Sequence, residues 1–227
     1  MTTPTHPTLI TLTQPQSPAA EAFRQLRTSV QFYAVDRPLK TVMVTSTNAE
    51  EGKSSVIANL AVTLAQAGRS VLLVDADLRR PSLHTLFGVE QAKGLSTVLA
   101  DPTIALPLQA TGVDGLLLLT SGVLPPNPSE LLASQRMADL VTALSARADY
   151  VLFDAPPVVA VTDAAVLASR MDGVLLVLKA AKSKRELAQR AKEQLEKVNA
   201  RILGVVLTNA PVDATLRTYG SPATPNA

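Results

Sequence analysis

No cysteine occurs among the 227 residues of this chain. Disulfide bonds, catalytic thiols and cysteine-ligated zinc sites are therefore excluded, and a reducing compartment suits the sequence. The two histidines, His6 and His84, lie far apart and have no spacing typical of metal ligands. The longest apolar run, residues 173–178, has the length of a strand and is too short to cross a membrane. We therefore expect a cytoplasmic protein without a membrane span of its own.

Aromatic residues and net charge are also low. Phe, Trp and Tyr make up 3% of the sequence, so a core must be built mainly from Leu, Val and Ala, within the 47% of residues that are hydrophobic. The formal net charge of +2 gives no strong field to attract nucleic acid, and we expect no nucleic-acid partner. The N-terminus has no charged segment followed by an apolar one, which excludes a signal peptide.

The length of the chain fits one α/β domain, expected at residues 18–209, between two polar flanks. Residues 1–17 are rich in Thr and Pro, and residues 210–227 have almost no apolar periodicity, so both flanks are expected to be flexible. In between, short apolar strands alternate with helices, which predicts a mostly parallel sheet covered by helices on both faces. Strands are expected at 42–45, 71–75, 116–120, 150–154, 173–178 and 203–208, and helices at 18–34, 53–67, 129–146, 162–168 and 184–200.

A phosphate-binding loop is predicted directly after the first of these strands. Residues 45–55 read TSTNAEEGKSS, in which Gly52, Lys53 and Ser54 form a Gly-Lys-Ser ending. In such a loop the backbone N–H groups wrap the phosphates, the Lys places a charge on the outer phosphates and the Ser hydroxyl reaches Mg²⁺. The match is incomplete, because Thr47 occupies the position of the usual first Gly.

Carboxylates follow two later strands. Asp75 ends the strand at 71–75, Asp77 comes two residues later, and Asp154 ends the strand at 150–154. In a parallel sheet these strand ends share one edge, where an Asp commonly joins the loop Ser in holding Mg²⁺. Any one of these residues could instead cap a turn. Because all three follow the loop in this order, a nucleotide site with Mg²⁺ is the favoured interpretation.

The motifs resemble those of the bacterial tyrosine kinases of capsule and exopolysaccharide synthesis, often called BY-kinases. The family's first motif has the form T-S-x-x-P-G-x-G-K-S, its second is three apolar residues and D-x-D-x-R, and its third is an apolar run and D-x-P. The residues that match these motifs are Thr45, Ser46, Gly52, Lys53, Ser54, Asp75, Asp77, Arg79, Asp154 and Pro156. Segments 94–100, 125–134 and 203–209 are also similar, so the resemblance covers about residues 15–210.

The resemblance implies a fold of the P-loop NTPase type and the transfer of a phosphoryl group from ATP to tyrosine hydroxyls, with Mg²⁺ as cofactor. Ser54, Asp77 and Asp154 would hold the metal ion. The residues implied to contact the nucleotide are Glu51, Gly52, Lys53, Ser54, Ser55 and Asn209. A turn-forming role is equally open for Asn209.

Four residues are implied in catalysis by the same resemblance: Lys53, Asp75, Asp77 and Arg79. Lys53 would neutralise charge on the phosphates, and Asp75 would accept or orient the proton of the tyrosine hydroxyl. Asp77 would help to hold the metal, although the division of roles between Asp75 and Asp77 stays open. Arg79 would either reach the transferring phosphoryl group or support the loop.

The first predicted helix carries a further match, E-x-x-R-x-x-R, at Glu21, Arg24 and Arg27. Their spacing of three places them on one face of the helix, one turn apart. In the family this helix docks on the neighbouring subunit and builds a homo-oligomeric ring, which is the favoured interpretation here. An exposed ladder of ion pairs is the alternative.

Three departures from the family pattern affect the expected partners. Ala49 and Glu50 stand where the family commonly has Pro-Gly, so Glu50 must tolerate the backbone conformation of that Gly. The family tends to carry several tyrosines near the C-terminus, whereas this tail has Tyr219, the expected autophosphorylation site. No membrane activator segment is recognisable, so a separate membrane activator or adaptor of polysaccharide export is expected to recruit the protein to the inner face of the membrane. Protein tyrosine substrates and a cognate phosphatase are the remaining implied partners.

Two rival functions stay open. A partitioning or division-site ATPase shares the scaffold but carries a second Lys four residues before the invariant Gly, where this chain has Asn48. A non-catalytic or weakly hydrolysing nucleotide-binding scaffold in polysaccharide assembly is the other, and the single tail tyrosine keeps it open.

Overall fold

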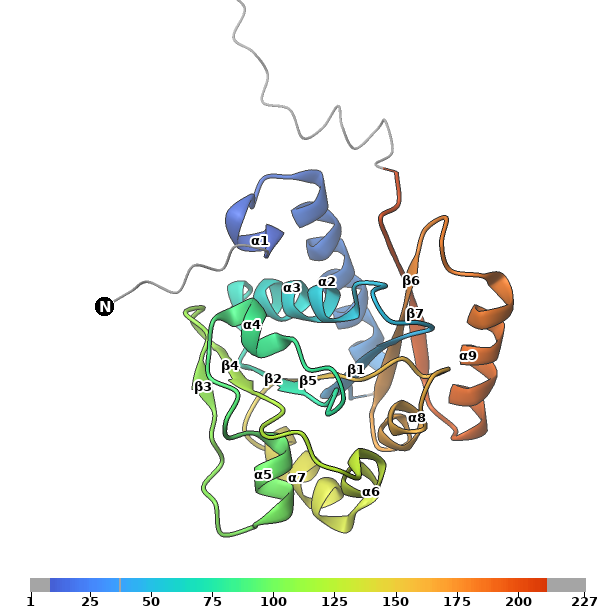
Figure 1. Cartoon of the computed structure of the whole chain (residues 1–227). Helices are drawn as coiled ribbons and strands as arrows, with labels where there is room; N and C mark the ends of the chain where they lie inside the picture. Colours follow the sequence, from blue (N-terminus) through green and yellow to red (C-terminus); the bar gives the residue numbers. More distant parts are fainter. Residues whose placement is uncertain (1–8, 37, 212–227) are drawn as a thin grey trace, which may run out of the picture.

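A computed structural model describes residues 9–36 and 38–211 of the chain (Figure 1). Among these residues, seven strands form one sheet in the order β3-β4-β2-β5-β1-β6-β7, parallel throughout except for the antiparallel pair β3–β4. The strands are β1 (Thr41–Ser46), β2 (Val71–Asp75), β3 (Gln109–Ala110), β4 (Leu116–Leu119), β5 (Tyr150–Asp154), β6 (Gly173–Lys179) and β7 (Ile202–Thr208). The expected fold class, a mostly parallel sheet with helices on both faces, is confirmed.

Helices cover the two faces in separate groups. They are α1 (Ile10–Thr13), α2 (Pro18–Asp36), α3 (Lys53–Gln66), α4 (Leu83–Phe87), α5 (Leu95–Ala100), α6 (Pro128–Ala133), α7 (Gln135–Ser145), α8 (Asp163–Ala168) and α9 (Arg185–Lys197). Figure 1 shows α1 to α4 on one side of the sheet and α5 to α8 on the other. Two clusters of buried apolar side chains fill the two layers, and α9 contributes to the second of them.

Successive side chains along each strand point to opposite faces of the sheet, so they pack in different cores. Val42 and Val44 of β1 pack in the cluster under α3, whereas Met43 between them packs in the cluster on the α7 side. Val71 and Leu72 of β2 divide in the same way. Because both faces of every central strand are buried, the strands are apolar throughout, which explains why sequence alone locates them.

The N-terminal flank is a correction to the sequence-based expectation. We expected residues 1–17 to be flexible, but from Leu9 onward the chain is folded against the domain, while residues 1–8 lie outside the described part. Leu9 is fully buried, and Thr11 donates from its backbone N (3.1 Å) and its hydroxyl (2.8 Å) to Asn59 Oδ1 of α3. These contacts fix a one-turn helix that has no periodicity long enough to be recognised.

Other boundaries differ where side chains interrupt a pattern. The helix expected at 129–146 is two helices, because Ser134 is extended and its hydroxyl accepts the backbone N–H of Met137 to cap α7. The short elements α4, α5 and β3 were not expected. No helix within residues 9–36 and 38–211 is long and apolar enough to cross a membrane. Of the tail expected at 210–227, all but the first two residues lie outside the described part.

A close backbone approach fixes the segment before α5. Leu95 donates its backbone N–H to Thr120 O at 2.7 Å, which brings Gly94 against the end of β4. A Cβ atom at Gly94 would lie 2.1 Å from Thr120 O and 2.4 Å from Gly122 N, both of which are backbone atoms. Only glycine fits at this position without a shift of the main chain.

Replacing Gly94 by Ala should therefore lower the free energy of unfolding by about 1–3 kcal/mol or more, as overpacking does. Gly204→Ala in β7 is the matched control, because no atom lies within 4 Å of its added Cβ. Urea unfolding of the two variants measures the difference. Equal stability of both variants would contradict the assigned packing before α5.

Candidate functional site

The motifs meet because β1, β5 and β2 are neighbours in the sheet. The predicted phosphate loop joins the end of β1 to the start of α3, and Asp75 of β2 is paired with Asp154 of β5 in the strand register. Ala76 donates its backbone N–H to Asp154 O at 2.9 Å, which continues the pairing beyond the strand. The carboxyl edge of three adjacent strands thus gathers the loop and both carboxylate motifs, as the sequence predicted.

Lys53 lies at the centre of this group. Its Nζ is 2.8 Å from Asp77 Oδ2, 3.3 Å from Asp154 Oδ1 and 3.3 Å from Ser54 Oγ. Only 11% of the Lys53 side chain is exposed. Burial alone would lower the pKa of Lys53, but the charges of Asp154 and Asp77 outweigh it and raise the pKa above its usual value. The lysine is therefore fully charged.

The two strand-end carboxylates, Asp75 and Asp154, are fully buried. Burial, and next the nearby charge of Asp154, raise the pKa of Asp75 to about 8. The hydrogen bond that Leu83 N donates to Asp75 lowers this pKa but does not outweigh them. Burial likewise raises the pKa of Asp154, while Lys53 and the Ser54 hydroxyl oppose the shift. Asp75 Oδ1 and Asp154 Oδ2 are buried without a hydrogen-bond partner among the described residues. Each therefore remains available to a ligand.

Asp77 is oriented by the turn that follows it. Its Oδ1 accepts from Arg79 N (3.3 Å) and Arg80 N (2.9 Å), which leaves Oδ2 for Lys53. The guanidinium of Arg79 is held by Asp163, to which it donates from Nε (2.8 Å) and Nη2 (3.1 Å). Arg79 thus stands at the rim of the site with its strongest contacts directed to α8.

The loop contains two residues with positive φ and a buried carboxylate, Glu51, that holds the loop by hydrogen bonds (the Glu51 clamp). Gly52, before α3, has φ +91°, and Glu50 has φ +62°, so Glu50 adopts the left-handed conformation that its place in the motif required. Glu51 is 4% exposed, and its carboxylate accepts from Thr47 N (2.8 Å) and Asn48 N (3.0 Å). The Ser183 hydroxyl, from the loop before α9, also donates to Glu51. Sequence analysis missed this clamp and grouped Glu51 with the nucleotide contacts.

Two hollows flank the loop. One, of about 700 Å³, is lined by Lys53, Ser54, Asp77, Arg79 and Pro156. The other, of about 590 Å³, lies between the loop, α2 and the end of β7, and Asn209 and Ser55 line it. Asn209 is exposed, with φ +54°, which also suits a turn. The sequence-predicted contacts of the nucleotide therefore surround two adjoining spaces.

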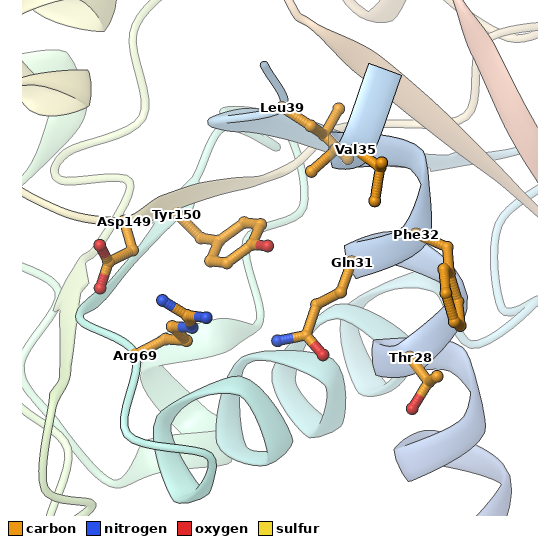
Figure 2. A pocket seen from close by; sticks show the side chains of 9 residues that line it. Thr28, Gln31, Phe32, Val35, Leu39, Arg69, Asp149 and Tyr150 are labelled. Carbon is orange, nitrogen blue, oxygen red and sulfur yellow. The ribbon is translucent and has the colours of Figure 1, made fainter. Parts of the chain in front are cut away.

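A further hollow, of about 530 Å³, lies at the other edge of the sheet (Figure 2). Arg69, two residues before β2, and Tyr150, the first residue of β5, point into it, together with Gln31 of α2. Tyr150 is 7% exposed and packs in the apolar cluster under α3. Because the loop and the carboxylates lie at the carboxyl ends of the strands, this hollow is separate from them.

The side chains fit a magnesium–nucleotide complex. Mg²⁺ prefers oxygen ligands and usually keeps waters and substrate phosphates in its shell. The Ser54 hydroxyl, Asp77 and the unpartnered Asp154 Oδ2 supply such oxygens beside Lys53. Within the described ranges no three or more His, Asp or Glu side chains could hold a metal ion by themselves. The donor set therefore suits an ion that is shared with phosphates.

The expected interface residues make contacts within the chain. Arg24 Nε is 2.6 Å from Glu21 Oε2, and Arg27 Nη1 donates to Thr63 O of α3 at 3.2 Å. All three lie on α2, whose first turns border the hollow at Asn209. Tyr219, the expected autophosphorylation site, lies outside the described residues.

Comparison with known proteins places this geometry in a family. A family model described as "ParA: NUBPL iron-transfer P-loop NTPase" matches residues 38–211. The tyrosine-protein kinase YwqD of Bacillus subtilis is 44% identical over 200 residues, which are 88% of this chain and 84% of YwqD. The putative tyrosine-protein kinase EpsB of Ralstonia nicotianae is 40% identical over 208 residues, 91% of this chain but only 28% of EpsB.

Solved structures agree with the sequences. The kinase domain of the Escherichia coli tyrosine kinase ETK superposes with a TM-score of 0.86 at 35% identity, over 91% of this chain and 82% of that domain. The matched region contains the loop, the carboxylates and the strands that carry them. The chain therefore belongs to the bacterial tyrosine-protein kinases, a family with the P-loop NTPase fold.

Proposed function

We propose that this protein is an ATP-dependent protein-tyrosine kinase that phosphorylates itself and regulates capsule or exopolysaccharide synthesis. The observation that carries the proposal is the position of Lys53. Its ammonium lies between Asp77 and Asp154, beside the Ser54 hydroxyl and at the N-terminus of α3. The start of a helix favours anions, so phosphates are drawn to the place where the lysine and the metal-binding oxygens converge.

Phosphoryl transfer at such a site depends on positioning and on neutralising charge. Lys53 and the backbone N–H groups of the loop bind the outer phosphates and keep the transferring group in line with the acceptor. Ser54, Asp77 and Asp154 hold Mg²⁺, which when bound screens the negative charge that the phosphates carry. The Glu51 clamp keeps the loop in shape, because it ties Thr47 and Asn48 to the loop before α9.

Asp75 is proposed to take the proton of the tyrosine hydroxyl. Two backbone N–H groups, of Ser82 (3.1 Å) and Leu83 (3.0 Å), fix its Oδ2. The other oxygen, Oδ1, is buried and has no hydrogen-bond partner among the described residues, so its lone pairs are free to accept a proton. A carboxyl whose pKa is raised to about 8 is a stronger base, once ionised, than one with an ordinary pKa. In this step the tyrosine O–H bond breaks as Oδ1–H forms. The tyrosine oxygen forms a bond to the γ-phosphorus of ATP while the bond from that phosphorus to the β,γ-bridging oxygen breaks, and ADP leaves.

The assembly and its partners are also part of the proposal. Residues Glu21, Arg24 and Arg27 of α2 would exchange their internal contacts for a neighbouring subunit in a ring. A separate membrane activator would recruit the ring to the inner face of the membrane. The chain matches 84% of the length of YwqD but only 28% of the length of EpsB. Protein tyrosines, including Tyr219, are the proposed substrates, and a cognate phosphatase would reverse the reaction.

The rival functions have less support. Asn48 occupies the position of the signature lysine of partitioning ATPases. The chain has no cysteine, the usual ligand of iron–sulfur clusters, so the iron-transfer part of the family description is not carried over. A non-catalytic scaffold would need the same nucleotide site, and only a test of phosphoryl transfer separates it from a kinase.

Lys53→Met should reduce phosphotyrosine formation in purified protein with Mg-ATP by about 10²–10³-fold, because the charge on the transferring group is no longer matched. Lys192→Met is the matched control, since Lys192 is exposed on α9 and its Nζ lies 3.5 Å from Glu196 Oε1. Anti-phosphotyrosine detection gives the rates, and circular dichroism checks the fold. Equal phosphorylation by Lys53→Met and the control would refute the site, and no phosphotyrosine in wild-type protein would favour the scaffold.

The raised pKa of Asp75 predicts how stability depends on pH in the nucleotide-free protein. Between about pH 4 and pH 8 the Asp75 carboxyl keeps its proton in the folded state, whereas in the unfolded state it has lost that proton. The free energy of unfolding should therefore fall as pH rises through this window, with a slope approaching about 1.4 kcal/mol per pH unit.

Asp75→Asn should flatten that slope, since Asn keeps an oxygen for the N–H groups of Ser82 and Leu83 but does not titrate. Asp114→Asn, at an exposed position, should leave the slope unchanged. Urea unfolding at several pH values measures both. A slope in Asp75→Asn as steep as in wild type would show that Asp75 is not the protonated group.

Tyr219 should be the main autophosphorylation site. It lies 11 positions beyond Thr208, the last residue of β7, and an extended segment of that length reaches roughly 36–40 Å. Mass spectrometry after incubation with Mg-ATP should find phosphate on Tyr219, and Tyr219→Phe should remove most of it, whereas Tyr33→Phe should not. Phosphate only on Tyr33 or Tyr150 would contradict this assignment.

A further inference from the structure

A buried carboxylate, Asp163, holds the arginine of the D-x-D-x-R motif. Asp163 is the first residue of α8 and is fully buried, whereas the Arg79 side chain is 42% exposed. The guanidinium donates from Nε and Nη2 to the two different oxygens of Asp163, at 2.8 and 3.1 Å. This bidentate arrangement is the strongest geometry for an arginine–carboxylate pair. A buried carboxylate also needs such a partner, since an unpaired buried charge is costly.

Ser129 completes the cluster from a third element. Its hydroxyl donates to Asp163 Oδ1 and lies 3.4 Å from Arg79 Nη2. Ser129 is near the start of α6, in the segment 125–134 that resembles the kinase family but has no part in the proposed chemistry. The cluster therefore ties the turn after β2 to the starts of α6 and α8.

The same turn orients both motif carboxylates through its backbone. Arg79 N and Arg80 N donate to Asp77 Oδ1, and N–H groups a few residues later hold Asp75 Oδ2. Asp77 then presents Oδ2 to Lys53 at 2.8 Å. An anchored guanidinium fixes the turn, the turn fixes the Asp77 carboxylate, and that carboxylate faces the proposed metal and phosphates.

We infer that Asp163 and Ser129 are positioning residues of the magnesium site, and that Arg79 acts through them to hold Asp77 in place and does not bind the phosphates itself. The inference rests on the proposed function only in taking Asp77 as a ligand of Mg²⁺. Its basis is the three-way contact of Asp163 with Arg79 and Ser129, together with the backbone hydrogen bonds to Asp77.

The test is the binding of a fluorescent ATP analogue, titrated with Mg²⁺ and also measured without the metal. Asp163→Asn should raise the Mg²⁺ concentration for half-maximal binding about tenfold or more, as loss of a group that orients a metal ligand commonly does. Affinity for the metal-free analogue should stay within about twofold of wild type, because the loop contacts are intact. Asp139→Asn, an exposed carboxylate on α7, is the matched control and should change neither value.

Two further variants separate positioning from general destabilisation. Ser129→Ala should shift the Mg²⁺ requirement in the same direction but less, and Ser129→Thr, which keeps the hydroxyl, should restore wild-type behaviour. If Asp163→Asn does not fold, the two Ser129 variants test the inference by themselves. A fold that is merely weakened lowers the fraction of binding protein and leaves the Mg²⁺ midpoint unchanged.

Arg79→Ala decides between anchoring and direct contact. If Arg79 acts through the cluster, Arg79→Ala and Asp163→Asn should shift the Mg²⁺ midpoint equally, and the double variant should be no worse than either. A large loss of metal-free affinity in Arg79→Ala alone, or an unchanged Mg²⁺ midpoint in Asp163→Asn and Ser129→Ala, would overturn the inference. Because binding is measured, the result stands apart from whether wild-type protein forms phosphotyrosine.

Discussion

The buried ion cluster of Lys53 with Asp77 and Asp154, and with Asp75 beside it, is the interaction on which the rest of the site depends. Moving carboxylates out of water costs several kcal/mol each, and one ammonium cannot balance three of them. The protein relieves part of this cost by protonation, because the pKa of Asp75 is raised to about 8. The remaining negative charge favours a cation beside the lysine. Mg²⁺ and the phosphates of the nucleotide would complete the charge balance of this cluster.

The sheet brings these charged side chains close together, and backbone hydrogen bonds fix how they are oriented. Asp75 and Asp154 face each other in the register of β2 and β5, so their separation is set by strand pairing. The turn after β2 then directs Asp77 towards Lys53 and fixes one oxygen of Asp75. On the other side of Lys53, the Glu51 clamp determines the path of the loop. Hydrogen bonds from main-chain N–H groups to carboxylates thus orient Asp75, Asp77 and Glu51.

The sequence was sufficient for the parts that short patterns encode. The parallel strands were located because most of their residues are apolar and the central ones are buried on both faces, and the loop and carboxylates were placed at one edge because parallel strands end together. What it did not reveal depends on contacts between distant residues. Nothing in the order of residues indicates that Glu51 turns inward to Ser183, that Asp163 pairs with Arg79, or that Leu9 and Thr11 dock on α3. The break at Ser134 was missed because apolar periodicity continues across it.

A crystal structure with Mg²⁺ and a non-hydrolysable ATP analogue tests the central claim most directly. The quantity to measure is the distance from Lys53 Nζ to Asp77 Oδ2, which is 2.8 Å in the structure described here. The account predicts that this contact breaks, that the lysine moves to the outer phosphates, and that Mg²⁺ lies between Ser54, Asp77 and Asp154. An intact contact between Lys53 and Asp77, with the analogue bound elsewhere, would contradict it.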